Sequence, residues 1–192
     1  GQPPSGRNWR NPGGTNARLR QTRGAPQHLL RHKMVKKLRS LLSQVQDMAH
    51  VWPQFEVALG PGPNSVVWFG PLKGLERPFT LSIEHGLPVS GLVQRHRLFP
   101  VVRVLRPSLV LNFNAGEEAP LPHVYFEGPD YRLSPLCLFD PTAKEWNPSM
   151  SIARTTVPWA ARWLACYELW EATGRWHGGG RHMTQEDPKD AA

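Results

Sequence analysis

The spacing of large apolar residues changes twice along the 192-residue chain, and these changes restrict the possible folds more than any other feature. Before residue 50 the apolar residues recur at steps of three and four, the pattern of an amphipathic helix. They are Leu30, Met34, Leu38, Leu41, Val45 and Met48. We therefore expect a helix that starts soon after Pro26 and runs to about His50.

The middle of the chain has the two-residue period of β-strands. The run PFTLSIE alternates Phe79, Leu81 and Ile83 with smaller polar residues, which is typical of a half-buried strand. Three more extended runs, WPQFEVAL, VVWFG and VVRVLRP, are separated by glycine- and proline-containing stretches. The pattern predicts an antiparallel meander of up to four strands.

Helical spacing returns near the C-terminus, after an irregular segment. Residues 107–136 contain seven proline and glycine residues and little periodicity, and loops of that length are usually functional or disordered. Beyond them one helical face is expected to carry Trp159, Trp163, Cys166, Tyr167 and Trp170, with Gly174 as the stop. The order helix, strands, long loop, helix predicts the α+β class with segregated elements.

The net charge of +8 is concentrated at the N-terminus. Residues 1–39 contain ten Lys and Arg and no acidic residue, whereas the rest of the chain has 13 basic and 15 acidic residues. Composition favours a disordered basic arm over residues 1–25, a domain over 26–183 and a disordered tail over 184–192. Nucleic-acid binding by the arm stays an alternative, which the scarcity of aromatic residues beside Trp9 disfavours.

Several classes of protein are disfavoured by composition. No stretch approaches the about 18 apolar residues of a membrane span, and the first residues lack the apolar segment of an export signal. The two cysteines lie 29 positions apart without a CxxC pair, which argues against a disulfide framework or a zinc site. We expect a protein of the reducing cytoplasm, with no membrane association and no cofactor.

The two cysteines differ in their surroundings. Cys166 lies within the apolar stripe of the last helix, where a free cysteine packs as a small hydrophobic residue. Cys137 ends the irregular segment, between two leucines and just before Asp140. Its own neighbours favour packing, but a reactive thiol stays open.

The residues after Cys137 carry a resemblance to a known family. Nine positions on, the run Trp146-Asn147-Pro148-Ser149-Met150-Ser151-Ile152 resembles the segment that follows the active-site cysteine of ubiquitin-conjugating enzymes. The order of elements agrees over residues 26–176. Further motifs resemble the bacterial branch encoded in CBASS anti-phage operons, among them His123-x-Tyr125, Leu136-Cys137-Leu138-Phe139, Tyr167-Glu168 and Gly178-Gly179-Gly180-x-His182.

The resemblance implies a ubiquitin-conjugating-enzyme-like fold: an N-terminal helix, a four-stranded antiparallel meander, an active-site loop and a C-terminal helix. It implies that Cys137 accepts the C-terminal acyl group of a protein such as a cGAS-like nucleotidyltransferase and passes it to an amine on a target. The chain contains neither GxxxxGK[ST] nor GxGxxG, so we expect it not to adenylate its own substrate. Whether a separate activating enzyme is needed stays open.

The chain departs from the family at the group that would stabilise the oxyanion. Eukaryotic relatives place His-Pro-Asn shortly before the cysteine, whereas this chain has Pro122-His123-Val124-Tyr125, with the histidine 14 residues before Cys137. His123 is the leading candidate, either as a structural hydrogen-bonding group or as a catalytic assistant. Weaker candidates for assistance are Asp140, Asn147, Tyr125 and His182.

Two questions stay open. The glycine-rich segment 178–180 suits a flexible loop, a loop that brings His177 or His182 beside the cysteine, or, least of all, a metal site that also includes His123. The alternative to an enzyme is an inactive scaffold with the same fold. The missing Pro-Asn favours the scaffold, and the retained Cys137 disfavours it.

Overall fold

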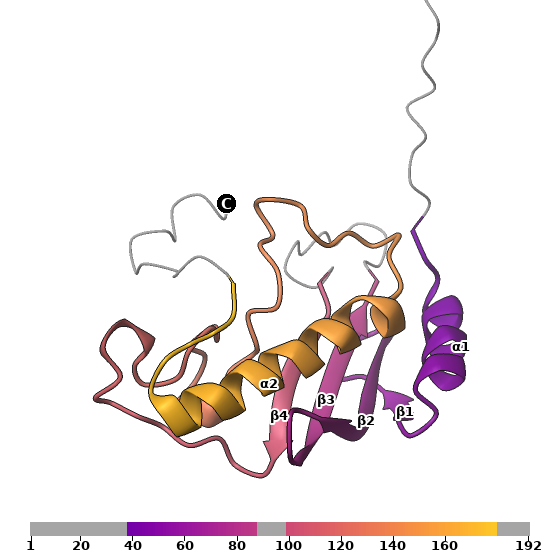
Figure 1. Cartoon of the computed structure of the whole chain (residues 1–192). Helices are drawn as coiled ribbons and strands as arrows, with labels where there is room; N and C mark the ends of the chain where they lie inside the picture. The colour runs from indigo at the N-terminus through magenta and orange to yellow at the C-terminus, as the bar shows by residue number, and fades with distance from the viewer. Residues whose placement is uncertain (1–37, 88–98, 180–192) are drawn as a thin grey trace, which may run out of the picture. The chain divides into compact units, whose positions relative to one another are not determined.

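The computed structural model describes residues 38–87 and 99–179 (Figure 1). Helix α1 (Leu41–Val51) is followed by the strands β1 (Glu56–Leu59), β2 (Ser65–Lys73), β3 (Pro78–Gly86) and β4 (Val101–Arg106). The last long element is helix α2 (Thr156–Thr173). Short 3-10 helices lie between β4 and α2: η2 (Gly116–Glu118), η3 (Tyr131–Leu133) and η4 (Ile152–Arg154).

The four strands form one antiparallel sheet in the order β1-β2-β3-β4, with each strand next to its neighbour in sequence. The expected α+β class and the four-stranded meander between two helices are thus confirmed, and the arrangement is consistent with a ubiquitin-conjugating-enzyme-like fold.

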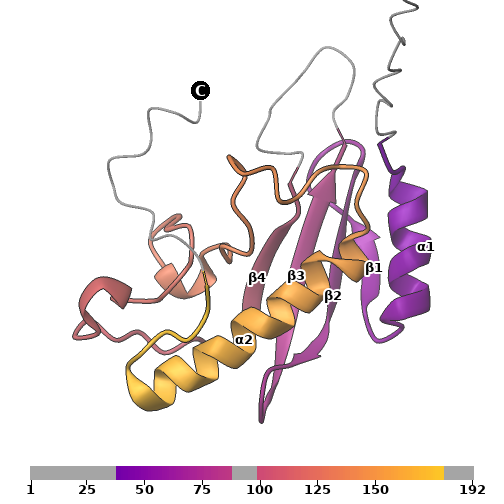
Figure 2. The ribbon, with the colours of Figure 1, turned by 45° about the horizontal axis from the view of Figure 1, so that its top comes forward.

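Helix α2 crosses one face of the sheet (Figures 1 and 2). The predicted alternation along β3 holds, since Phe79, Leu81 and Ile83 are at most 1 % exposed and belong to the core. From α2 the buried face adds Trp163 and Tyr167, whose rings stack at 5.5 Å. The apolar face of the strand and the apolar face of the helix, each predicted from its own spacing, therefore pack in one core.

Helix α1 begins later than the apolar period predicted. Ser40 is its N-cap, and the Ser40 hydroxyl accepts a hydrogen bond from the Ser43 amide at 3.1 Å. Leu38 lies before the helix and is half exposed, so its assignment to the helix was wrong. A capping serine defines a helix start more sharply than apolar spacing does, because it satisfies an otherwise free amide. Leu30 and Met34 lie outside the described residues.

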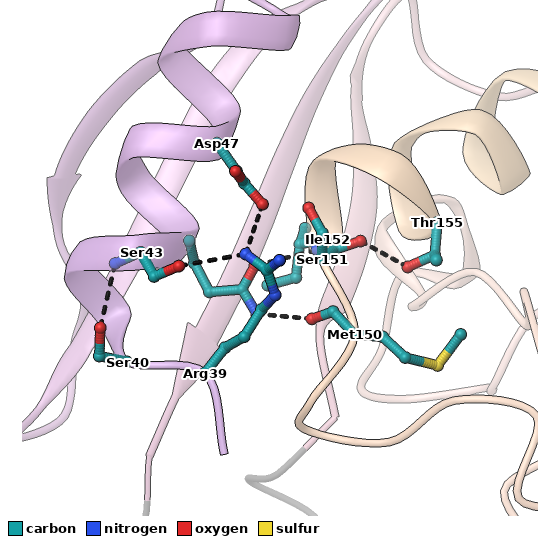
Figure 3. A network of polar contacts seen from close by, with 9 residues as sticks. Arg39, Ser40, Ser43, Asp47, Met150, Ser151, Ile152 and Thr155 are labelled. Atoms are coloured by element: carbon teal, nitrogen blue, oxygen red, sulfur yellow. Dashed lines mark hydrogen bonds and ion pairs between the residues drawn. The ribbon is translucent and has the colours of Figure 1, made fainter. Parts of the chain in front are cut away.

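Gln44 joins α1 to the segment that leads into α2. Figure 3 shows the neighbouring contacts, in which the Arg39 side chain binds Ser43 and Asp47 of α1. Gln44 is fully buried, and its amide nitrogen donates to the Met150 carbonyl at 2.8 Å. Its side-chain oxygen accepts from the Ile152 amide at 3.0 Å. Arg39 adds a backbone bond to the Pro148 carbonyl. These contacts fix the segment after the cysteine, and they explain why a polar residue is tolerated in the core.

Helix α2 ends as expected at Gly174, which adopts the left-handed conformation (φ 72°) and donates its amide to the Trp170 carbonyl. Cys166 is buried on this helix, in agreement with its assignment to packing. Glu168, part of a motif in the resemblance, accepts backbone hydrogen bonds from Leu75, Glu76 and Arg77. Its role is to hold the β2–β3 turn against α2.

The segment between β4 and α2 is irregular apart from the 3-10 helices, as predicted for residues 107–136. Leu109, Leu121, Val124 and Leu136 from this segment are nevertheless buried in the core. Among the described elements, none is a helix of the length and hydropathy that crossing a membrane requires.

Candidate active site

Cys137 lies at the end of a short antiparallel bridge between Val124 and Leu136. Its amide donates to the His123 carbonyl at 2.9 Å, and the Tyr125 amide donates to the Pro135 carbonyl at 2.8 Å. The Leu136 amide donates to a carbonyl of β4 at 2.8 Å, which ties the bridge to the sheet. The backbone at Cys137 is therefore held on both sides, although the segment has no regular structure.

The Tyr125 hydroxyl is a polar side-chain group in contact with the Cys137 thiol. The sulfur donates to the phenolic oxygen at 3.4 Å, and the hydroxyl donates to the Phe139 carbonyl at 3.5 Å. Tyr125 lies opposite Pro135 across the bridge. Cys137 is two residues beyond Pro135 on the same segment, so it shares that face with Tyr125. The structure thus brings together two residues that the sequence places 12 positions apart.

The half-buried Cys137 thiol is in an environment that disfavours its charge. Burial raises the pKa of Cys137, and the negative charges of Asp140 and Glu145 raise it further. The hydrogen bond with Tyr125 opposes them and lowers the pKa. Burial and the nearby thiol raise the pKa of Tyr125 in turn, so this hydroxyl stays protonated and able to donate.

His123 acts on the site through its backbone and its ring. It adopts the left-handed conformation (φ 47°), which is uncommon for a residue other than glycine. Its carbonyl accepts from the Trp163 indole at 3.0 Å as well as from the Cys137 amide. Its imidazole stacks on Trp176 with the ring centroids 4.9 Å apart. Of its two suggested roles, this geometry favours the structural one.

Asp140 and Asn147 form turns on either side of the loop after the cysteine. One Asp140 carboxylate oxygen accepts from the Thr142 amide at 2.7 Å and from its hydroxyl at 2.6 Å. The Asn147 side-chain oxygen accepts from the Ser149 amide and hydroxyl. Both residues are turn formers here. Asp140 still acts on the thiol electrostatically, through its effect on the pKa of Cys137.

Trp146 fills the space beneath the loop. It is 2 % exposed and stacks on Phe139 with the ring centroids 6.2 Å apart, so it packs against this loop. His85 of β3 lies edge-on to the Trp146 ring at 5.8 Å. The loop that carries Cys137 therefore rests on an aromatic layer rather than on polar contacts alone.

The last described residues test only part of the interpretations of the glycine-rich segment, which placed His177 or His182 beside the cysteine. His177 is exposed, and His182 lies outside the described residues. Over residues 38–87 and 99–179, no group of three or more His, Cys, Asp or Glu residues is placed to hold a metal ion. The residue that does reach the site, Trp176, was missed. The sequence feature that could have indicated it is a single large aromatic residue among glycine and polar residues.

Comparison with known proteins adds the family. A family model described as "Type II CBASS E2 protein" matches residues 44–183, which include the bridge, the cysteine loop, Trp163 and Trp176. The chain belongs to this family. A search of curated proteins gave no match. Membership in the CBASS E2 family supports an E2-like role in anti-phage defence, in concert with other CBASS proteins.

Proposed function

We propose that this CBASS E2 protein is a cysteine thioester carrier and that Cys137 is its nucleophile. The observation that carries the proposal is the pair formed by Cys137 and Tyr125, a half-buried thiol 3.4 Å from a hydroxyl on a backbone fixed by hydrogen bonds. Cys166, by contrast, is buried in α2. A structural cysteine needs no such partner, because it packs as a small hydrophobic residue.

The chemistry has two steps without any change of oxidation state. In the first, the Cys137 thiolate adds to an activated C-terminal carbonyl, the bond to the activating group breaks, and that group leaves with the electron pair. In the second, a target amine adds to the thioester carbonyl, an amide forms, and the Cys137 thiolate leaves. The proton lost by the amine returns to solvent or to the sulfur.

Tyr125 is the leading donor to the charge that develops in both steps. Its hydroxyl already lies within hydrogen-bond distance of the sulfur, and it is positioned to donate to a thiolate there. A raised thiol pKa reduces the thiolate fraction at neutral pH, but a thiolate of high pKa is also a poor leaving group. The site is thus suited to hold an acyl group until a bound amine arrives.

The resemblance suggests the reaction partners. The acyl donor we propose is the C-terminus of a cGAS-like nucleotidyltransferase, and the acceptor is an amine on a target protein. An inactive scaffold is the second candidate, and the burial that raises the pKa of Cys137 favours it. Thiol labelling discriminates between the two, because a scaffold gives Cys137 no faster reaction with iodoacetamide than the buried Cys166.

The test is coexpression of the protein with its neighbouring genes, followed by non-reducing electrophoresis. The wild type and Cys166→Ala should both form an adduct that a reducing thiol removes. Cys137→Ser should trap a more stable ester or form nothing, and Cys137→Ala should form nothing. An adduct that persists in Cys137→Ala would sink the assignment.

A further inference from the structure

The chain reverses direction beyond α2, as Figure 1 shows for the yellow residues that follow the helix. The turn is made at Gly174. Trp176 then places its indole against two rings, that of His123 with centroids 4.9 Å apart and that of Trp163 with centroids 5.8 Å apart. Its neighbours Arg175 and His177 are exposed. Trp176 therefore anchors this segment to the body of the domain.

His123, Trp163 and Trp176 form one cluster, which we name the aromatic bracket. Trp163 donates its indole N–H to the His123 carbonyl, and Trp176 stacks on the His123 ring with an interplanar angle of 23°. The aromatic bracket therefore contacts His123 twice, through a hydrogen bond to its backbone carbonyl and through a stack on its ring. These two contacts offset the cost of the left-handed conformation of His123, which is unfavourable for a residue other than glycine.

The conformation of His123 determines where Cys137 lies. The carbonyl that Trp163 holds also accepts the Cys137 amide at 2.9 Å. A rotation of the His123 backbone would swing this carbonyl away and release the Cys137 end of the bridge. The thiol would then leave the Tyr125 hydroxyl and become more exposed.

We propose that Trp176 is a positioning residue for the reaction at Cys137, acting through His123 and the bridge. The inference rests on the proposed thioester function, but part of its test needs no acyl donor. Because the Trp176 indole N–H is buried with no partner among the described residues, its ring matters for stacking rather than for hydrogen bonding. Phenylalanine should therefore replace it, whereas alanine should not.

The test follows the alkylation of Cys137 by iodoacetamide against pH, with Cys166 as the internal control for unfolding. In Trp176→Ala, the alkylation midpoint of Cys137 should fall toward the ordinary cysteine value, because burial is the main cause of its raised pKa. Cys137 should label faster at neutral pH, while acyl loading slows by about tenfold or more as the thiol is misplaced. Cys166 should stay protected.

Trp176→Phe should restore both readouts, and His177→Ala is the matched control, since it changes an exposed residue of the same segment. An unchanged Cys137 profile in Trp176→Ala would overturn the proposal. If that variant exposes Cys166 as well, the decision passes to Trp176→Leu, which keeps an apolar cover over Trp163 but removes the stack. A wild-type profile for Cys137 in Trp176→Leu overturns the proposal, and a shifted profile supports it.

The two proposals fail in different ways. A wild-type protein that never forms an adduct, yet shows the Trp176-dependent labelling profile, contradicts the thioester function and leaves the structural coupling intact. A wild-type protein that forms the adduct, with labelling and loading unchanged in Trp176→Ala, contradicts the positioning role alone.

Discussion

His85 should make the free energy of unfolding depend on pH, and substitution of this one residue should remove that dependence. The side chain is 1 % exposed on β3, against the ring of Trp146. Neither ring nitrogen has a hydrogen-bond partner among the described residues. Burial lowers the pKa of His85 from 6.5 to about 4, because the interior offers nothing to stabilise the imidazolium.

The sign and size of the effect follow from the two pKa values. Below pH 6.5 the unfolded chain takes up a proton at this histidine that the folded protein excludes, so stability falls as the pH falls toward 4. The loss between pH 7 and pH 5 is about 2 kcal/mol, and it approaches about 3 kcal/mol at and below pH 4.

The assay is urea unfolding at pH 7 and at pH 5, followed by tryptophan fluorescence. The free energy of unfolding of the wild type should fall by about 2 kcal/mol more than that of His85→Leu, which has no titrating group there. His177→Ala, which removes an exposed histidine, should behave as the wild type. An equal loss in the wild type and in His85→Leu would refute the reasoning.

Three further predictions use other contacts. Tyr125→Phe removes the hydrogen bond that lowers the pKa of Cys137, so alkylation of Cys137 near pH 8 should slow by about fivefold; a rate equal to the wild type's contradicts the pairing. Glu168→Ala removes the carboxylate that holds the β2–β3 turn and should lower the free energy of unfolding, measured with urea, by about 2–3 kcal/mol. A loss below about 0.5 kcal/mol would show that the carboxylate is dispensable. Deletion of residues 1–25 should leave the free energy of unfolding unchanged within about 0.5 kcal/mol and abolish any salt-sensitive binding to nucleic acid; a larger loss of stability means that the arm packs on the domain.

The order of elements was predictable because apolar period and turn residues are local signals. The alternation at Phe79, Leu81 and Ile83 predicted β3 correctly, and Gly174 marked the end of α2. The start of α1 was missed because Leu38 continues the apolar spacing past the capping Ser40. A pattern based on hydrophobicity alone cannot register a helix start that a single hydroxyl specifies.

The candidate site was harder to predict, because its contacts join residues far apart in sequence. The resemblance singled out Cys137. The spacing of the motif residues, however, gives no information about the bridge that places Tyr125 beside the thiol. His123 was expected to be a structural hydrogen-bonding group or a catalytic assistant, and its carbonyl accepts a hydrogen bond from the Cys137 amide. Backbone contacts of this kind leave no residue-type signature, and the role of Trp176 depends on the same long-range folding.

The central claim is that Cys137 carries an acyl group as a thioester. Its most direct test is mass spectrometry of the wild-type protein purified without reductant from cells that express the neighbouring CBASS genes. The account predicts a mass increase equal to an acyl donor, mapped to the peptide that contains Cys137 and lost on treatment with hydroxylamine. An unmodified Cys137 in the presence of all its partners, or an adduct on another residue, would contradict it.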